Sequence, residues 1–472
     1  LGDVYKRQML RHLGLAGKTV IIDECHAYDR YMYVYLENSL RWMAAYNVPV
    51  IILSATLPPD KRAELIKWYT GSKNSFDNSS MAYPVLTWSD GAEVKQKDIP
   101  VDIPDKPITV IRREENDSND IVNLLEDKLS DGGCAAVIVN SVAYSQELAD
   151  TIAANMPDYR VICFHSRLIS TDRAVIEREL TELVGKKSTC EKRDKLIVVG
   201  TQVLEQSLDI DFDYMITELC PMDLLLQRSG RLHRHNRTRP DKLSEPELCV
   251  LIPEDFSKSV YSGWILKQTE KYLPDKLVIP GCIPELVGAV YSEPDNDEQQ
   301  TAEYRKYSDE QKEKKQRAKK YCIPSQKINR SDSTLSDMIN RRELNNDSDG
   351  EAAVRDGQET IEALVLVKTS DTEYSLFSRD AVFDITSVPD NAQAKLIAKQ
   401  RLRLPAFFSK SYNFGKTIEI LANSMPQAWR NAKWLKGEIL LLLDGNNKIS
   451  MLGRTYKYST ERGFEEIKEE ES

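Results

Sequence analysis

Short apolar runs alternate with helix-like stretches along most of this chain, and no other feature constrains its fold as strongly. The runs are rich in valine and isoleucine and have no polar break, which is typical of strands buried on both faces of a parallel sheet. They lie at 20–22, 48–53, 135–139, 160–164, 195–199 and 214–219. Helices are expected at 31–47, from Pro58 to about Trp68, and at 143–154, 171–184 and 222–232. Strands that alternate with helices at this spacing predict a doubly wound α/β fold.

Length and composition narrow the class of protein further. At 472 residues the chain is too long for a single core, and about three domains are expected. A net charge of -10 argues against an all-over basic nucleic-acid binder but not against a local basic groove. The eight cysteines are scattered without a C-x-x-C pair, which favours reduced thiols and a cytoplasmic location. No apolar run reaches membrane-spanning length, and no signal peptide is expected.

The first strand ends in two carboxylates, Asp23 and Glu24. In open α/β sheets, the chemistry takes place just beyond the carboxyl ends of the strands. One carboxylate at that position can hold the magnesium ion of a bound nucleotide, and a second can polarise the attacking water. Taken alone, the same residues also fit a strand that ends in an acidic turn.

Two other patterns suggest ligand sites but lack parts that such sites need. Residues 14–19 end like a phosphate-binding loop, but His12 stands where the loop requires glycine, and a strand follows instead of a helix. The acids within 209–213 begin like a calcium loop, but Tyr214 replaces its glycine and Cys220 its closing glutamate. We therefore expect a turn at the first and no calcium at the second.

Polar strings follow several of the strands, and together they form an ordered set. They are Asp-Glu-Cys-His at 23–26, Ser-Ala-Thr at 54–56, the run from Gly200 to Asp211, and Gln-Arg-Ser-Gly-Arg-Leu-His-Arg at 227–234. Their order is that of motifs II, III, V and VI of superfamily 2 helicases. With Phe-His-Ser-Arg at 164–167, they resemble the CRISPR-associated helicase-nuclease of type I systems, most closely the type I-E form. The resemblance covers 19–255 strongly and 351–472 more loosely.

The resemblance implies two RecA-like parallel-sheet lobes, the first one incomplete, and a small C-terminal α+β domain. The expected parts are 1–105 for the end of the first lobe, 106–256 for the second lobe, 257–350 for a charged, partly helical linker, and 351–472 for the C-terminal domain. Within the linker, 301–320 predicts a long helix that we expect to be solvated rather than a basic contact arm. The turn at Asp444–Asn447 predicts a hairpin in the C-terminal domain.

The resemblance also implies roles for the residues at the two strand ends of the first lobe. Asp23 would bind magnesium, and Glu24 would position and deprotonate the hydrolytic water. Ser54 and Thr56 would couple the state of the nucleotide to movement. The side chain of Cys25 is expected to point into the core.

Motif VI of the family faces the nucleotide, which implies roles for Gln227, Arg231 and Arg234. Arginine suits this position because its planar, always-charged fork can neutralise the charge on the γ-phosphate oxygens. Gln227 would orient the water or contact His26, and Asp209 would meet the ribose or the arginines. The acids of one sheet and the arginines of the next are expected to face each other across the nucleotide.

Nucleic acid would lie across the strand ends of both lobes. Gly200 and Thr201 would offer a backbone N–H and a hydroxyl to a phosphate, and Asn140, Ser141 and Arg167 follow neighbouring strands. Such contacts follow a single strand without reading its sequence. For Arg167, a surface ion pair is an equally good interpretation.

Members of the family carry an HD nuclease domain and a phosphate loop upstream of the acidic strand. The chain starts at Leu1 with no initiator methionine, and its five histidines include no His-Asp pair. We therefore expect a fragment that hydrolyses ATP negligibly by itself. The whole protein would be a monomeric, Mg²⁺- and ATP-dependent translocase on single-stranded DNA opened by an RNA-guided surveillance complex. A generic superfamily 2 RNA or DNA helicase and a non-catalytic interaction module remain alternatives.

Overall fold

The computed structural model describes two compact units. They comprise residues 1–107, 221–223 and 261–356 in the first unit, and 108–220, 224–260 and 357–472 in the second. Within them, the described residues are 14–15, 17–25, 29–71, 80, 82–90, 93–100, 105–114, 117–205, 208–321 and 360–467. No helix among these residues is both long and apolar enough to cross a membrane.

The first unit contains the acidic strand. β1 (Val20–Ile22) pairs in parallel with β2 (Val50–Ile52), as predicted. The inner sides of both strands pack against α2 (Arg30–Ala45) and α3 (Pro59–Thr70). The outer side of this small sheet is open, because Ile21 is 63% exposed and Ile51 47%, so the expectation that these two runs are buried on both faces is wrong. A strand with one covered and one open face has the alternating burial that both strands display.

A β-hairpin follows α3, in a stretch where the apolar runs of the sequence indicate no strand. It consists of β3 (Val85–Ser89) and β4 (Val94–Asp98), which pair antiparallel. The sequence did not reveal this hairpin because β4 has the sequence Val-Lys-Gln-Lys-Asp, with a single apolar residue. Apolar alternation was therefore too weak to indicate a strand.

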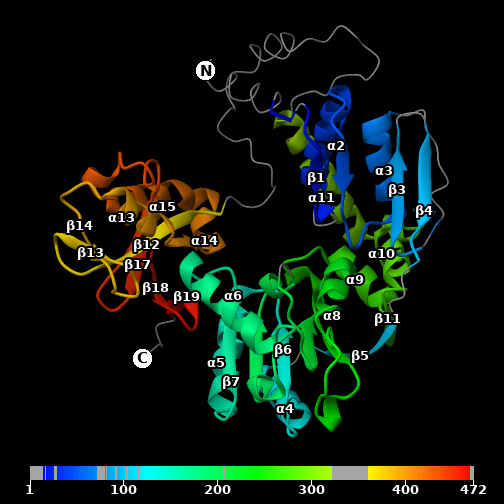
Figure 1. The fold of residues 1–472 in the computed structure, drawn as a ribbon, viewed down its shortest axis with the longest axis horizontal. Helices are drawn as coiled ribbons and strands as arrows, with labels where there is room; N and C mark the ends of the chain where they lie inside the picture. The colour runs from blue at the N-terminus through cyan, green and yellow to red at the C-terminus, as the bar shows by residue number, and fades with distance from the viewer. Residues whose placement is uncertain are drawn as a thin grey trace. The chain divides into compact units, whose positions relative to one another are not determined.

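The first unit also holds α9 (Gly263–Tyr272), β11 (Lys276–Ile279), α10 (Ile283–Tyr291) and α11 (Ala302–Tyr321). The predicted helix at 301–320 is confirmed, and most of its side chains are exposed, as expected for a solvated helix, but one part of it packs against another helix. α11 lies beside α2 (Figure 1), and the fully buried Ala318 packs against Tyr31 and Val34. A small residue on an otherwise charged helix allows this close approach, which a charge count alone does not reveal.

The second unit is built on a fully parallel sheet in the order β5-β10-β9-β6-β8-β7. The strands are β5 (Lys106–Glu114), β6 (Cys134–Ile138), β7 (Arg160–Phe164), β8 (Leu196–Gly200), β9 (Tyr214–Glu218) and β10 (Glu247–Ile252). The helices are α4 (Ser118–Lys128), α5 (Val142–Asn155), α6 (Ser170–Val184), α7 (Cys190–Arg193) and α8 (Met222–Ser229). The central strands β6 and β8 are buried along their whole length, so the predicted doubly wound α/β class is confirmed.

The C-terminal domain is α+β, as expected. Its first sheet contains β12 (Glu362–Lys368), β13 (Glu373–Ser375), β14 (Val382–Asp384), β15 (Arg401–Arg403) and β16 (Leu440–Leu443). Its helices are α13 (Asn391–Ala398), α14 (Ala406–Ser409) and α15 (Ser411–Ser424). A meander of β17 (Lys448–Met451), β18 (Arg454–Ser459) and β19 (Gly463–Ile467) follows. The turn at Asp444–Asn447 is present, with a hydrogen bond from Asp444 N to Lys448 O at 2.8 Å. The predicted hairpin is wrong, because the strands on either side of the turn belong to different sheets: β16 pairs with β12, and β17 with β18.

Candidate functional site

The acidic turn lies at the carboxyl end of β1. Asp23 and Glu24 are both exposed, and the N–H of Glu24 donates to Asp23 Oδ1 at 2.9 Å. Glu24 has a φ of 53°, a left-handed conformation that is uncommon for a residue with a side chain. Cys25, by contrast, is fully buried, which confirms that its side chain enters the core. The turn therefore presents two carboxylates to solvent while its next residue anchors it.

The turn and the Ser-Ala-Thr string are in direct contact. Burial raises the pKa of the Cys25 thiol to about 11, while a hydrogen bond with the Ser54 side chain acts in the opposite direction. Thr56, two residues further along, is 4% exposed, and its Oγ1 has no hydrogen-bond partner among the described residues. A buried hydroxyl without a partner costs free energy.

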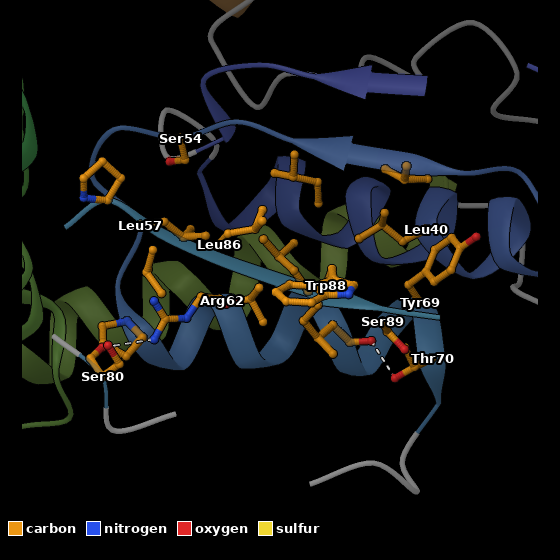
Figure 2. A pocket seen from close by; sticks show the side chains of 18 of the residues that line it. Leu40, Ser54, Leu57, Arg62, Tyr69, Thr70, Ser80, Leu86, Trp88 and Ser89 are labelled. Atoms are coloured by element: carbon orange, nitrogen blue, oxygen red, sulfur yellow. Dashed lines mark hydrogen bonds between the residues drawn. The ribbon is translucent and has the colours of Figure 1, made fainter. Parts of the chain in front are cut away.

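A groove of about 1320 Å³ lies beside these residues within the first unit. Figure 2 shows Ser54 and Leu57 at one end and Tyr69 at the other, with Leu86 and Trp88 between them. Polar and apolar atoms contribute about equally to its lining, which includes Arg62 and Asp90.

The exposed carboxylates fit a magnesium ion that is shared with a ligand. Mg²⁺ prefers hard oxygen donors and commonly takes one or two carboxylates together with waters and substrate phosphates. Asp23 and Glu24 supply such oxygens at the strand end. In the described ranges, no group of three or more His, Cys, Asp or Glu residues could hold a metal ion without other ligands. An ion here would therefore depend on the phosphates of a nucleotide.

In the second unit, Arg228 links the two polar strings at 200–211 and 227–234, which resemble motifs V and VI. It is fully buried, and its Nε donates to Glu205 Oε1 at 2.7 Å. Its two Nη atoms donate to Thr217 Oγ1 at 2.7 Å and to Asn140 Oδ1 at 3.1 Å. The sequence prediction missed this residue. Helical periodicity could have predicted its burial, because Arg228 lies three positions after the buried Leu225 on the same face of α8.

The predicted nucleotide-binding residues follow α8 or lie on it. Gln227 is half-buried on the helix, and Arg231 donates from Nη2 to Glu205 O at 2.7 Å. Arg234 is exposed and pairs with Asp209 at 2.7 Å. The sequence predicted that Asp209 meets either the ribose or the arginines, and in the structure it pairs with an arginine. His26, the other predicted partner of Gln227, lies outside the described residues.

Charge around Asp209 keeps its carboxyl ionised. Burial alone would raise the pKa of Asp209, but the hydrogen bond from Arg234 and the neighbouring positive charges hold the pKa below its usual value. The pair remains half-exposed, so its contribution to stability is small. A carboxylate that restrains Arg234 without burying it leaves the guanidinium accessible to a ligand.

The acids that began like a calcium loop instead bind arginines. Asp211 is fully buried and accepts from Arg239 at 2.9 Å and from Arg193 at 3.3 Å. Asp213 pairs with the same two arginines. These contacts tie α7 and the segment after the arginine motif to the start of β9. They fix the course of the chain that carries Arg231 and Arg234.

The four residues predicted to contact nucleic acid at the ends of β6 and β8 have contacts within the unit. Asn140 Nδ2 donates to Leu219 O at 2.9 Å, and Ser141 caps α5 by accepting from Tyr144 N at 3.1 Å. A Cβ on Gly200 would come within 2.6 Å of Phe164 O, so only glycine fits there. The N–H of Thr201 donates to that same oxygen at 3.3 Å. Their contact with nucleic acid remains a prediction.

Arg167 and His165 pack against the C-terminal domain. His165 is fully buried; its Nδ1 accepts from Arg167 N at 3.1 Å, and its Nε2 lies 3.0 Å from Arg462 O. Burial lowers the pKa of Arg167, while Tyr456 and Glu466 of β18 and β19 oppose this shift. The predicted nucleic-acid contact of Arg167 is therefore untested, and its surroundings belong to the C-terminal domain.

Mild acid is expected to destabilise the second unit through His165. Burial lowers the pKa of this imidazole to about 4, from an ordinary value of 6.5. Between these values the unfolded chain binds a proton that the folded chain does not, so the free energy of unfolding falls as the pH falls. At the lower end of this pH window, the free energy of unfolding is expected to be smaller by about 3 kcal/mol.

Denaturant unfolding of His165→Gln and the parent chain across this pH window tests the effect. The variant is expected to lose most of the pH dependence, whereas the surface control Arg160→Ala, in the same unit, is expected to retain it. An equally steep fall in His165→Gln and in the parent would contradict the assignment.

Comparisons with known proteins agree with these features. A family model for the C-terminal part of the CRISPR-associated nuclease/helicase Cas3 matches residues 131–237, and one for the Cas3 C-terminal domain matches residues 355–464. The CRISPR-associated nuclease/helicase Cas3 of Streptococcus thermophilus is 38% identical over 97% of this chain and 52% of its own length. The chain thus spans about half the length of this curated relative.

Solved structures are similar over nearly the whole chain. The crystal structure of T. fusca Cas3 with ATP has 27% identity and a TM-score of 0.80, covering 96% of this chain and 54% of that one. A chain in a CRISPR RNA-guided surveillance complex in a pre-nicking state has 26% identity and a TM-score of 0.77, covering 96% and 58%. The similarity includes both the acidic turn and the arginine-bearing segment.

Proposed function

This chain belongs to the Cas3 family of CRISPR-associated nuclease/helicases, as its motifs predicted, and we propose that it forms half of an ATP-driven DNA motor. The whole protein would move along single-stranded DNA that an RNA-guided surveillance complex has opened. The observation that carries this proposal is the 38% identity over 97% of the chain. That range includes the exposed Asp23 and Glu24 as well as Arg231 and Arg234.

We propose that both sets of residues act on one ATP. Asp23 would hold Mg²⁺, which would neutralise phosphate charge, and Glu24 would position and deprotonate the attacking water. Arg231 and Arg234 would stabilise the charge that develops on the γ-phosphate, with Gln227 orienting the water. The exposure of both carboxylates supports these roles, as does the ion pair that restrains Arg234.

Ser54 and Thr56 would couple hydrolysis to movement. Two features support this role: the hydrogen bond between Ser54 and Cys25, and the buried, unpaired hydroxyl of Thr56. A change at the acidic turn would reach Ser54 directly. Thr56 would gain a hydrogen bond in the second state of the cycle.

The proposed partners are single-stranded DNA and a surveillance complex, and the proposed location is the cytoplasm. Asn140, Ser141, Gly200 and Thr201 remain the candidate DNA contacts, and Arg167 would act at the edge next to the C-terminal domain. All cysteines in the described part of the chain are free thiols, which supports a reducing compartment. We propose that the protein acts as a monomer.

ATP turnover tests the function. The chain alone is expected to hydrolyse ATP negligibly. Fused to the part of the Streptococcus thermophilus relative that the match does not cover, it forms what we call the completed protein. The completed protein should hydrolyse ATP at about 1 per second or faster when single-stranded DNA is present. Turnover at that rate by the chain alone would contradict the first expectation.

The same assay separates the alternatives. Stimulation by RNA duplexes, with no response to a surveillance complex, would indicate a generic superfamily 2 helicase. Binding to a surveillance complex that neither ATP nor Glu24→Gln affects would indicate a non-catalytic interaction module. Either result would overturn the motor proposal.

A further inference from the structure

The C-terminal domain carries a tryptophan flanked by two lysines at its surface. Trp434 is 41% exposed. Lys395 Nζ lies 5.2 Å and Lys433 Nζ 5.7 Å from the centre of its ring. A single exposed aromatic residue is ordinary, but two ammonium groups placed over one open indole form a specific arrangement. We call these three residues the Trp434 patch.

The patch rests on a well-packed support. α13 begins with a capping box formed by Asp390 and Gln393. Ala394 and Ile397 of this helix share a core cluster with Leu435 and its neighbours. Because these side chains point inward, Lys395, Lys433 and Trp434 are directed to solvent. The patch is thus held by two packed segments rather than by a loose loop.

The chain segment that carries the patch is basic. Residues 391–437 contain Lys or Arg at nine positions and one carboxylate, Glu419, although the whole chain has a net charge of -10. Two of these cations, Arg401 and Arg403, pair with Glu438 and Glu362 outside the segment. Neither Lys395 nor Lys433 forms an ion pair with any residue in the described ranges. Their charges are therefore not neutralised by this part of the protein, and a polyanion would be attracted to them.

We propose that the Trp434 patch binds single-stranded nucleic acid, with a base stacked on the indole and phosphates paired with the two lysines. Aromatic rings within a basic surface suit single strands because every base offers a π-face and every linkage a phosphate. The lysine side chains are flexible, so an ammonium group can leave the ring for a phosphate when a base takes its place. The inference rests on the proposed DNA motor function and adds a contact outside the parallel-sheet lobe.

An acidic protein surface would also attract the lysines, but it gives the indole no flat partner. The exposed ring therefore favours nucleic acid over an acidic protein. This difference makes Trp434 the residue to test. A stacking contact depends on the aromatic ring, whereas a purely electrostatic contact depends only on the lysines.

Affinity for a short single-stranded thymidine oligonucleotide, measured by fluorescence anisotropy on the full chain, is the first readout. Trp434→Ala is expected to weaken binding about five- to a hundredfold without changing its salt dependence, and Trp434→Phe to retain most of the affinity. The double variant Lys395→Ala/Lys433→Ala is expected to reduce the slope of log K against log salt by about 1.4, or about 0.7 per phosphate contact. Lys448→Ala, an exposed lysine of β17, is the matched control and should do less.

Photocrosslinking locates the contact directly. An oligonucleotide that carries iodouracil is expected to crosslink to the segment containing Trp434. Crosslinks confined to the parallel-sheet lobe, or an unchanged affinity of Trp434→Ala, would overturn the inference. Equal, Trp434-dependent binding of polyglutamate would overturn it as well. DNA-stimulated ATP turnover by the completed protein would still report on the motor function separately.

Discussion

Arg231→Ala is expected to lower the ATP turnover of the completed protein about a thousandfold or more, and Glu24→Gln about a hundred- to ten-thousandfold. The arginine would stabilise charge that appears only in the transition state, and the glutamate would activate the water. Arg231→Lys should recover little, because an ammonium group lacks the planar fork of a guanidinium. Initial rates at saturating ATP with single-stranded DNA measure each effect.

Two controls distinguish lost chemistry from lost folding. Arg160→Ala removes a guanidinium that is 55% exposed and pairs with Glu179 on the surface, and turnover should be unchanged. Because Arg231 also donates to Glu205 O, its variants need an unfolding measurement beside the kinetic one. If Arg231→Ala kept most of its turnover while remaining folded, the proposed role of the residue would be wrong.

Arg228→Ala is expected to reduce the free energy of unfolding of the second unit by about 3–5 kcal/mol. The change breaks the ion pair of Glu205, whose side chain is only 1% exposed, and it removes the donors to Thr217 and Asn140. Breaking a buried ion pair costs more than the pair contributes, because the remaining charge cannot reach water. Denaturant unfolding, followed by hydrogen exchange of the β6 and β8 amides, measures the loss.

A surface pair provides the comparison for Arg228. Glu179→Ala breaks the pair with Arg160, and the expected cost is below about 1 kcal/mol. The double variant Arg228→Ala/Glu205→Ala should regain part of the lost stability, since it also removes the buried carboxylate whose ion pair with Arg228 is broken. Equal effects at the buried pair and the surface pair would mean that Arg228 does not anchor this motif.

The parallel sheet could be predicted because its strands are continuous apolar runs, and the acidic turn because it ends one of them. Carboxyl ends of parallel strands share an edge, which explains why the polar strings at 23–26 and 54–56 lie together. Cys25 and Ser54 make the contact between them. The hairpin β3–β4 was missed because β4 has a single apolar residue.

Partners distant in sequence could not be predicted. Asp211 and Asp213 looked like possible ligands, and only the fold reveals that Arg193 and Arg239 neutralise them. The burial of Ala318 against α2 likewise depends on packing that the charge pattern of its helix does not encode. Local periodicity predicts elements, whereas buried charge pairs arise from tertiary contacts.

The central claim is that the acidic turn and the arginine motif serve the same ATP molecule. The ATP turnover of the completed protein carrying both Glu24→Gln and Arg231→Ala tests it most directly, compared with each single variant. Residues that act as a unit are strongly non-additive, so the double variant should be about as slow as the slower single variant. Two independent losses that multiply in the double variant would contradict the claim.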